Sequence, residues 1–442
     1  MAKDLRFYLV TDTHYFENSL GASGEKYDEY MKTEQMCLAE NQAICRAVFS
    51  KIAEDKTTDI VIMPGDLTKD GEKESHKALI ADLYKLKQAG KRVYVITARH
   101  DFNEHPRAYC GNEYVPVEGT SREELFDLYY DFGYSEAIAI DRESMSYVAQ
   151  LDENTRLLAI NSDGTAERKG YIDDRLMAWL GEQIARAKKD NCYMFAINHY
   201  PIIPSVPIFS ILGDAKVKQW RTVASFLADS GINLIFTGHM HIQSINQYTS
   251  EQGNRLWDVC TSALVGAPAK FRHVSLSEGR SARIRSVSVP SFDWDMQGLT
   301  VEQYFNRQFG SMVGNKFNKI INYGSKDAKP ILKLVGRIAN NLTVGGVGRL
   351  LCLSADASVK KEKLFDFASV IVMNVFAGDP PYSKETAVYQ DIELALKRLK
   401  PIVKKLEKKL KDDGRPIDLK AIILGSICSD KPYSDNDAEL KL

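Results

Sequence analysis

The sequence lacks the features that mark several classes of protein. It has seven cysteines in 442 residues and no CxxC pair, which argues against a disulfide framework or a cysteine zinc site. No run reaches 18 apolar residues, so no membrane-spanning segment is expected. The opening "MAKDLRFYLVTDTH" runs almost directly into a strand without an apolar leader. We therefore expect a cytoplasmic protein with reduced, buried thiols.

An excess of charge is also missing. The 58 Lys and Arg nearly balance the 59 Asp and Glu, for a net charge of −1. The whole chain has no charge that would attract nucleic acid or an anionic membrane, and we expect neither as a partner. One basic run, "LKRLKPIVKKLEKKLK", is interpreted as a solvated helix face rather than a nucleic-acid surface. The oligomeric state stays open.

What is present in the first 290 residues is an alternation of strand and helix patterns. Short β-branched and aromatic runs predict strands at 6–10, 59–64, 92–97, 156–161, 193–198 and 233–237. Amphipathic segments predict helices at 28–54, 75–89, 173–188 and 216–229. Ser121 and Glu124 form a capping box for another helix. Residues 255–290 are expected to close the domain with antiparallel strands. This order predicts an α/β layered fold with helices outside the sheets.

The pattern changes after Pro290. Helical periodicity is found at 300–322, 329–342, 360–376, 386–411 and 418–427. We predict two domains, 1–290 and a helical C-terminal region over 291–442. Pro401 should kink or restart its helix. The polar tail from about residue 430 is expected to be disordered.

Polar clusters follow the predicted strands at their carboxyl ends, where ligands bind in α/β sheets. Five of the eight histidines belong to these clusters. The cluster residues are Asp12 and His14; Gly65 and Asp66; Arg99, His100 and Asp101; His199; and Gly238, His239 and His241.

Asp and His ligands without cysteine suit borderline metals such as Mn, Fe, Co, Ni or Zn. On an extended stretch, Asp12 and His14 would point to the same side, and so would His239 and His241. Taken singly, Asp66 is typical of a helix cap, and His199 of a satisfied polar residue. Five clusters in this order indicate a shared metal centre instead.

These motifs resemble the calcineurin-like metallophosphoesterase superfamily over roughly residues 5–290. The resemblance implies a four-layer αββα sandwich with a dinuclear metal centre. By position, the first metal would be held by Asp12, His14, Asp66 and His241. Asp66 would bridge to a second metal, which His199 and His239 would also hold. His100 would lie near the leaving group, oriented by Asp101.

One position departs from the family pattern. The third motif usually reads G-N-H-D or G-N-H-E, and its Asn is a ligand of the second metal. Here Arg99 stands in that place, and a guanidinium cannot ligate a metal. Three hypotheses stay open. Arg99 turns away and Asn103 or water replaces the Asn, or the guanidinium binds phosphate in place of a weakened or empty second site, or the site no longer cleaves.

The resemblance implies a metal-dependent phosphoesterase that uses two divalent ions and a metal-activated water. A small phosphodiester is favoured as substrate, because bacterial members with this two-part layout resemble cyclic-nucleotide and other phosphodiesterases. The alternatives are a phosphomonoesterase or nuclease of the same superfamily, and a degenerate, non-catalytic binding protein. Tyr15, Tyr27 and Tyr30 follow the first motif and could stack on a base, although core or surface roles are more typical.

Overall fold

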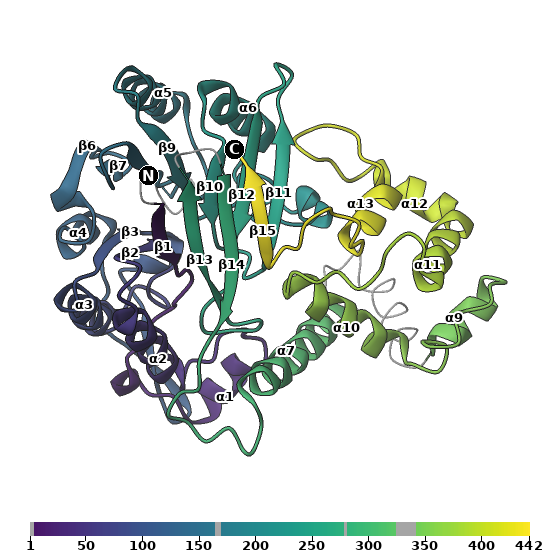
Figure 1. The fold of residues 1–442 in the computed structure, drawn as a ribbon. Coiled ribbons are helices and arrows are strands. Elements are labelled where there is room, and N and C mark those ends of the chain that lie inside the picture. Colours follow the sequence, from purple (N-terminus) through teal and green to yellow (C-terminus); the bar gives the residue numbers. More distant parts are fainter. Residues whose placement is uncertain (1–3, 164–168, 278–280, 324–341) are drawn as a thin grey trace.

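The computed structural model describes residues 4–163, 169–277, 281–323 and 342–442. The predicted helix at 329–342 therefore lies almost wholly outside the described residues. Two sheets dominate the first part of the chain (Figure 1). Among the described residues, no helix is both long and apolar enough to span a membrane.

The first sheet has the strand order β15-β14-β13-β1-β2-β3. β1, β2 and β3 run parallel, whereas β13, β14 and β15 are antiparallel to their neighbours. The helices α2 and α3 pack on its outer side. The bounds are β1 Leu5–Leu9, α1 Glu25–Met31, α2 Asn41–Glu54, β2 Ile60–Pro64, α3 Lys73–Gln88, β3 Arg92–Ile96, β13 Lys270–Ser277, β14 Ser281–Ser288 and β15 Asp437–Lys441.

The second sheet has the order β11-β12-β10-β9-β8-β7-β6, and α5 and α6 cover its outer face. Its elements are β6 Ala137–Asp141, β7 Ser146–Gln150, β8 Thr155–Ala159, α5 Asp174–Lys189, β9 Tyr193–Ile197, α6 Trp220–Ser230, β10 Leu234–Thr237, β11 Ser244–Thr249 and β12 Arg255–Cys260. The connection from β3 to β6 holds the hairpin β4 Arg107–Cys110 and β5 Glu113–Pro116, then α4 Arg122–Leu128. The Ser121–Glu124 capping box opens α4 as predicted.

The two sheets pack face to face through aromatic side chains. Phe7 of β1 is fully buried, and its ring stacks on Phe195 of β9 at 5.2 Å between centroids. Its edge-to-face contact with Phe236 of β10 is at 5.3 Å. Aromatic pairs at this spacing add to the burial of apolar area. With helices outside both sheets, the architecture is the four-layer αββα sandwich that the sequence implied.

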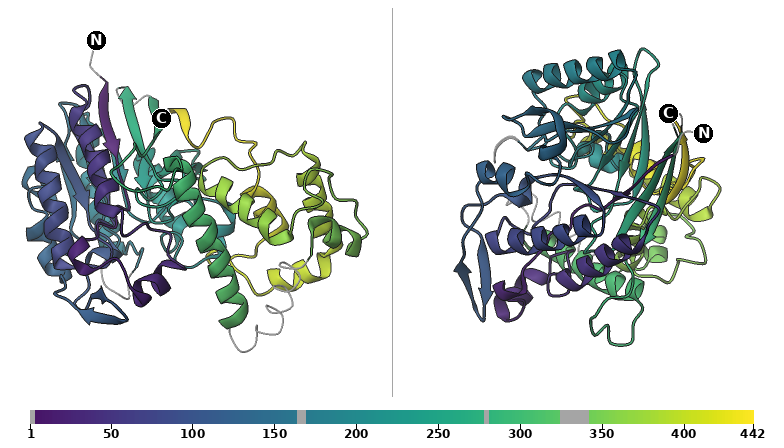
Figure 2. Two further views of the ribbon diagram at one scale, coloured as in Figure 1. Left: turned by 90° about the horizontal axis from the view of Figure 1, so that it is seen from below. Right: turned by 60° about the vertical axis from the view of Figure 1, so that its left-hand side comes forward.

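The C-terminal helices form a separate group at one side of the sandwich (Figure 2). The predicted segment 386–411 divides into two helices, because Pro401 begins a new one. The helices are α7 Val301–Tyr323, α9 Val344–Leu350, α10 Leu364–Phe376, α11 Ala387–Arg398, α12 Lys400–Glu407 and α13 Leu419–Ser426. The domain boundary at 290 stays a prediction.

The tail prediction was wrong. Asp437–Lys441 form strand β15, which pairs with β14 at the edge of the first sheet. Ala438 and Leu440 alternate with exposed polar residues and turn inward, so that Leu440 is 1% exposed. Two apolar residues among polar ones give too weak a periodic signal to predict a strand. The strand forms because the edge of β14 is open for pairing.

Three smaller expectations also need correction. The predicted helix 28–54 is two helices, and its middle segment leaves the helix to contact the loop after β12, where the Cys37 N–H donates to the Val265 carbonyl. The strands of 255–290 divide between the sheets, and β12 runs parallel to β10. All seven cysteines are free thiols, but only Cys37, Cys45 and Cys260 are buried.

Candidate metal centre

The carboxyl ends of strands from both sheets meet at one end of the sandwich. β1 and β2 of the first sheet lead to Asp12, His14 and Asp66. β9 and β10 of the second sheet lead to His199, His239 and His241. The structure thus brings together side chains that lie more than 200 positions apart in the sequence.

Two groups of potential ligands result. In each group, the ligand atoms lie within 4.8 Å of one another. The first group is Asp12, His14 and His241, and the second is Asp66, His199 and His239. The Asp66 Oδ2 atom lies 3.9 Å from His14 Nε2 and 3.0 Å from His199 Nε2, so this carboxylate faces both groups. This position is compatible with the predicted bridging role of Asp66.

The ligand residues have unusual backbone conformations. Five of them have positive φ angles, between 37° and 67°, which is rare for residues other than glycine. These five are Asp12, His14, Asp66, His239 and His241. The expectation that the two D-x-H and H-x-H pairs lie on extended stretches was therefore wrong. Tight turns after the strands aim these side chains, and such strain is concentrated at functional sites.

A glycine is required beside each group. A Cβ atom on Gly238 would lie 2.4 Å from Asp12 Oδ2, and one on Gly65 would lie 2.9 Å from His199 Nδ1. Real Cβ atoms do not approach other atoms so closely. The two glycines therefore let the backbone of one strand end pass directly against the ligand of another.

Backbone and amide oxygens fix the histidine rings. His199 Nδ1 lies 2.9 Å from the Pro64 carbonyl, and His239 Nε2 lies 2.6 Å from the Asp214 carbonyl. A carbonyl only accepts, so each of these nitrogens carries the hydrogen and the other ring nitrogen keeps its lone pair. His241 Nδ1 faces Gln35 Oε1 at 3.3 Å in the same way. This arrangement is typical of metal-ligating histidines.

The ring nitrogens that do not donate to these oxygens face carboxylate oxygens or other ring nitrogens. His241 Nε2 lies 3.3 Å from Asp12 Oδ1 and 3.1 Å from His14 Nε2. His199 Nε2 is buried and lies 3.0 Å from Asp66 Oδ2. Acceptors that face one another in a buried site need a cation between them. The donor set therefore fits divalent ions of the borderline class.

Electrostatics support the same conclusion. Burial acts to lower the pKa of His199, but the carboxylates of Asp66 and Asp12 outweigh it and raise the pKa to about 10. A proton and a metal ion would therefore compete for Nε2 of His199, which faces Asp66 Oδ2 at 3.0 Å. Burial acts to raise the pKa of Asp12, yet the neighbouring His241 and His199 lower it to about 2. Both carboxylates are almost completely buried. Such a site stabilises positive charge.

The third motif forms a short 3-10 turn, Arg99–Asp101, after β3. The His100 N–H donates to Asp66 Oδ1 at 3.1 Å, and its ring Nδ1 donates to the Lys69 carbonyl at 2.7 Å. Its ring lies edge-on to the His14 ring, with 5.0 Å between centroids. The Nε2 atom of His100 is therefore the free ring nitrogen, next to the first ligand group.

Asp101 was expected to orient His100, but its carboxylate forms no hydrogen bond with the His100 ring. Its Oδ1 accepts the Thr68 N–H at 2.8 Å, and its Oδ2 accepts the Ala98 N–H at 2.7 Å. These bonds tie the loops after β2 and β3 together. Burial and the nearby Asp66 raise the pKa of Asp101 to about 7. The Lys69 carbonyl, and not this carboxylate, orients the imidazole.

The Arg99 guanidinium acts electrostatically on Tyr200, whose ring lies 4.0 Å from the His239 ring. The Arg99 Nε is buried without a hydrogen-bond partner among the described residues, and its guanidinium carbon lies 5.9 Å from the centre of the Phe102 ring. Asn103, the residue suggested as a replacement ligand, uses its Oδ1 to accept the His105 N–H at 3.0 Å. Asn103 thus has a local turn role, which weakens the first of the three hypotheses for this position.

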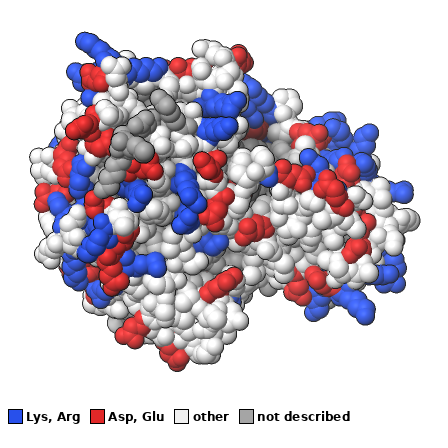
Figure 3. All heavy atoms as spheres, viewed as in Figure 1, with Lys and Arg blue, Asp and Glu red and all other residues white. Residues whose placement is uncertain are grey.

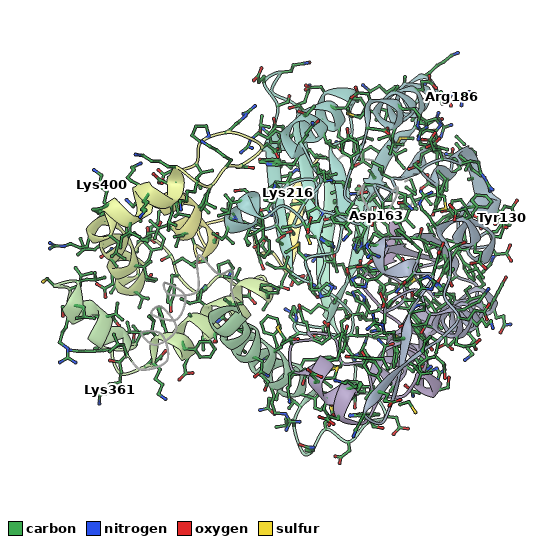
Figure 4. The ribbon with its side chains drawn as sticks, turned by 180° about the vertical axis from the view of Figure 1, so that it is seen from behind. Tyr130, Asp163, Arg186, Lys216, Lys361 and Lys400 are labelled. Atoms are coloured by element: carbon green, nitrogen blue, oxygen red, sulfur yellow. The ribbon has the colours of Figure 1, made fainter. Side chains whose placement is uncertain are left out.

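Sequence reasoning missed several residues that shape the site. Gln35 faces His241 and donates to the Ala267 carbonyl at 2.8 Å, and Asn41 Nδ2 donates to the His14 carbonyl at 2.8 Å. Asp163 is buried at the end of β8, inside the sandwich (Figure 4). Burial raises the pKa of Asp163 to about 6, against the opposing effect of His199. Only Asp163 carried a usable signal, because it also follows a predicted strand.

The tyrosines after the first motif do not line an open site. Tyr15 is fully buried, and its hydroxyl donates to Asp82 at 2.5 Å. Tyr27 is 8% exposed, and Tyr30 packs near Lys69, whose Nζ lies 4.9 Å from the ring centre. Their main roles are in the core and around the buried lysine, so they provide no stacking platform for a base.

An αββα sandwich with paired Asp and His groups at one end defines a metallophosphoesterase. The model of the calcineurin-like phosphoesterase family matches residues 5–243, more than half of the chain. The chain belongs to this family, and its class is a metal-dependent phosphoesterase.

Solved structures with a similar fold are distant. A dimetal phosphatase from Danio rerio is 13% identical, with a TM-score of 0.49, and the match covers 66% of this chain and 98% of that one. A purple acid phosphatase from yellow lupin (Lupinus luteus) seeds is 11% identical, with a TM-score of 0.43 and coverage of 65% and 52%. The NAD nucleotidase of Haemophilus influenzae is 11% identical, with a TM-score of 0.35 and coverage of 77% and 61%. No curated protein matches the chain. At TM-scores below 0.5, these likenesses are too distant to bear on function.

Proposed function

We propose that the protein hydrolyses a small phosphodiester, such as a cyclic nucleotide, at the centre formed by the two ligand groups. The observation that carries this proposal is the shared carboxylate Asp66, which faces both groups while its Oδ1 accepts from the His100 backbone. The first group, Asp12, His14 and His241, would hold one divalent ion, and His199 and His239 would hold a second with Asp66. When bound, such ions supply Lewis acidity and lower the pKa of water.

The chain's own residues then position and protonate the substrate. His100 keeps Nε2 free beside the centre because the Lys69 carbonyl occupies Nδ1. When this ring is protonated, Nε2 carries the second hydrogen and can give it to the oxygen that leaves. Arg99 carries a fixed positive charge next to His100 and can bind the non-bridging oxygens of the phosphate through its guanidinium fork. The alkoxide that leaves a phosphoester needs such a proton.

A second candidate function rests on Arg99 itself. Arg99 stands where the family usually has the Asn that ligates the second metal. A site of this kind could bind a phosphoester without cleaving it. The intact set of four histidines, His14, His199, His239 and His241, favours catalysis, since a decaying site loses several ligands.

Hydrolysis of bis(p-nitrophenyl) phosphate with added Mn²⁺ tests the proposal, with p-nitrophenyl phosphate as the monoester. We expect the unmodified chain to prefer the diester in kcat/KM. His100→Gln should lower kcat about 100-fold or more while the bound metal is unchanged. The exposed Arg283→Asn on β14 is the matched control for Arg99→Asn. Metal content is measured in parallel by elemental analysis.

The outcomes separate the hypotheses. An active chain that Arg99→Asn impairs means that the guanidinium belongs to a working site. Turnover that appears only in Arg99→Asn means that the natural chain binds and does not cleave. Full activity of His100→Gln would overturn the role of the imidazole.

A further inference from the structure

The C-terminal helical region concentrates positive charge on one surface. Residues 397–411 contain eight Lys and Arg and a single Glu, although the whole chain has a net charge of −1. This segment covers the end of α11, all of α12 and the turn that follows. Figure 3 shows several Lys and Arg over these helices at the upper right of the molecule, with Asp and Glu between them.

Most of these cations have no acidic partner. Lys397 pairs with Glu393 at 3.2 Å and Lys404 with Glu407 at 2.7 Å. The other six are exposed and form no ion pair with a residue that the structure describes: Arg398, Lys400, Lys405, Lys408, Lys409 and Lys411. Like charges held together in this way repel one another. A surface that keeps them unpaired is suited to an anionic partner.

The same surface exposes aliphatic side chains. Ile402 is 57% exposed and Leu406 is 44% exposed, and their spacing of four places them on one side of α12. Lys405 and Lys409 each follow one of them by three positions and therefore border them. Val403 is 8% exposed and lies on the inner side of the helix. α12 thus packs one apolar side against the rest of the protein. A second apolar strip, flanked by lysines, is exposed to solvent.

We propose that this face of α12, Ile402 and Leu406 with the bordering Lys405 and Lys409, docks on an anionic lipid bilayer. A bilayer interface accepts both parts of the surface, because acidic headgroups attract the lysines and the acyl boundary receives the aliphatic side chains. A nucleic acid would use the cations but leave two aliphatic side chains in water. Lys400 lies on the outer side of the helical region, away from the sandwich (Figure 4). A planar surface can therefore approach it.

This inference revises the expectation of no membrane partner. That expectation used the net charge of the whole chain, whereas binding depends on charge within about one Debye length of the surface, roughly 8 Å at physiological salt. Within residues 397–411, eight Lys and Arg outnumber the one Glu. The neighbouring Glu393 pairs with Lys397, and Asp412 pairs with Arg221 of α6, so neither is free to offset the unpaired lysines.

Co-sedimentation of the full chain with sucrose-loaded vesicles tests the proposal. Vesicles of phosphatidylcholine alone are compared with vesicles that contain three parts in ten of phosphatidylserine. We expect partitioning onto the acidic vesicles only, weakened by added salt. Lys405→Gln with Lys409→Gln should reduce the partition coefficient about 25-fold. Ile402→Ser with Leu406→Ser should reduce it by a similar order at constant charge.

Matched controls alter similar side chains elsewhere. Lys51→Gln with Lys189→Gln removes two exposed lysines from other helices, and Ile138→Ser removes an aliphatic side chain that is 52% exposed. Circular dichroism and thermal unfolding confirm that each variant folds. A short duplex DNA serves as a polyanion of another kind.

Two results would overturn the proposal. The first is equal partitioning of the control and α12 variants, which would mean that no particular face docks. The second is a dependence on Lys405 and Lys409 without any effect of the Ile402 and Leu406 changes, together with tight DNA binding. That pattern would assign the surface to nucleic acid.

Discussion

The buried His76 provides a quantitative test of the structure close to the proposed site. This histidine of α3 is completely buried. Its Nε2 lies 2.9 Å from the Asp101 carbonyl, which only accepts, so Nε2 carries the hydrogen. Its Nδ1 then accepts from the Tyr129 hydroxyl at 2.7 Å. The neutral ring satisfies both contacts, and a second proton on Nδ1 would point at a donor.

Burial therefore lowers the pKa of His76 from 6.5 to about 4. The unfolded chain binds a proton as the pH falls below 6.5, whereas the folded chain resists it until about pH 4. The contribution of His76 to the free energy of unfolding is present above pH 6.5 and is lost as the pH falls from 6.5 to about 4. The full loss is about 3 kcal/mol, and about 2.5 kcal/mol of it occurs by pH 4.5.

The variant His76→Gln isolates this effect. Gln is neutral throughout the range, and its amide can still donate to the Asp101 carbonyl. Urea unfolding is followed by tryptophan fluorescence between pH 7.5 and 4.5, with EDTA present so that metal binding does not vary. We expect the difference between the natural chain and His76→Gln to change by about 2.5 kcal/mol over this range.

His105→Gln is the control, because His105 is exposed. Its curve against pH should run parallel to that of the natural chain. The reasoning fails if His76→Gln also gives a parallel curve, within about 0.5 kcal/mol. In that case, protonation of His76 would not be opposed by its surroundings, and the hydrogen bonds to Tyr129 and Asp101 would be assigned wrongly.

Three further changes test the packing and the site. Phe7→Ala should cost about 3–5 kcal/mol in urea unfolding, because the ring is fully buried between the two sheets. Gly65→Ala should lower the Mn²⁺ content measured by elemental analysis, because the added Cβ would lie only 2.9 Å from His199 Nδ1 and would push this ligand aside. Normal metal content would refute this. Gly253→Ala has a similar positive φ and open space, and controls for backbone strain. Leu440→Asp should release β15 and speed C-terminal proteolysis; unchanged cleavage would contradict the strand pairing.

The sequence by itself determined the sheet strands and the candidate ligands. Runs such as "DIVIMP" and "NLIFT" are apolar because both faces of these parallel strands are buried. Polar residues directly after such strands share one edge of the fold, so local patterns were enough to predict that Asp12, Asp66, His199 and His239 would lie together.

Only the tertiary structure decided how these residues are held. The chain leaves the predicted helix 28–54 in its middle, and this exit brings Gln35 to His241. The Lys69 carbonyl orients His100, and Asp101 joins two loops instead. These contacts link segments that are far apart in the chain and use backbone groups, which every residue has. Side-chain identity alone could not predict them.

The same distinction applies to two elements of the C-terminal region, β15 and α12. The tail was too polar to indicate a strand, and β15 forms because β14 offers an unpaired edge with room for Ala438 and Leu440. In α12, the sequence showed the lysines, but only the packed structure shows that Val403 is covered while Ile402 and Leu406 are not. Local periodicity determines which elements form, whereas neighbours distant in sequence decide which faces and atoms remain free to act.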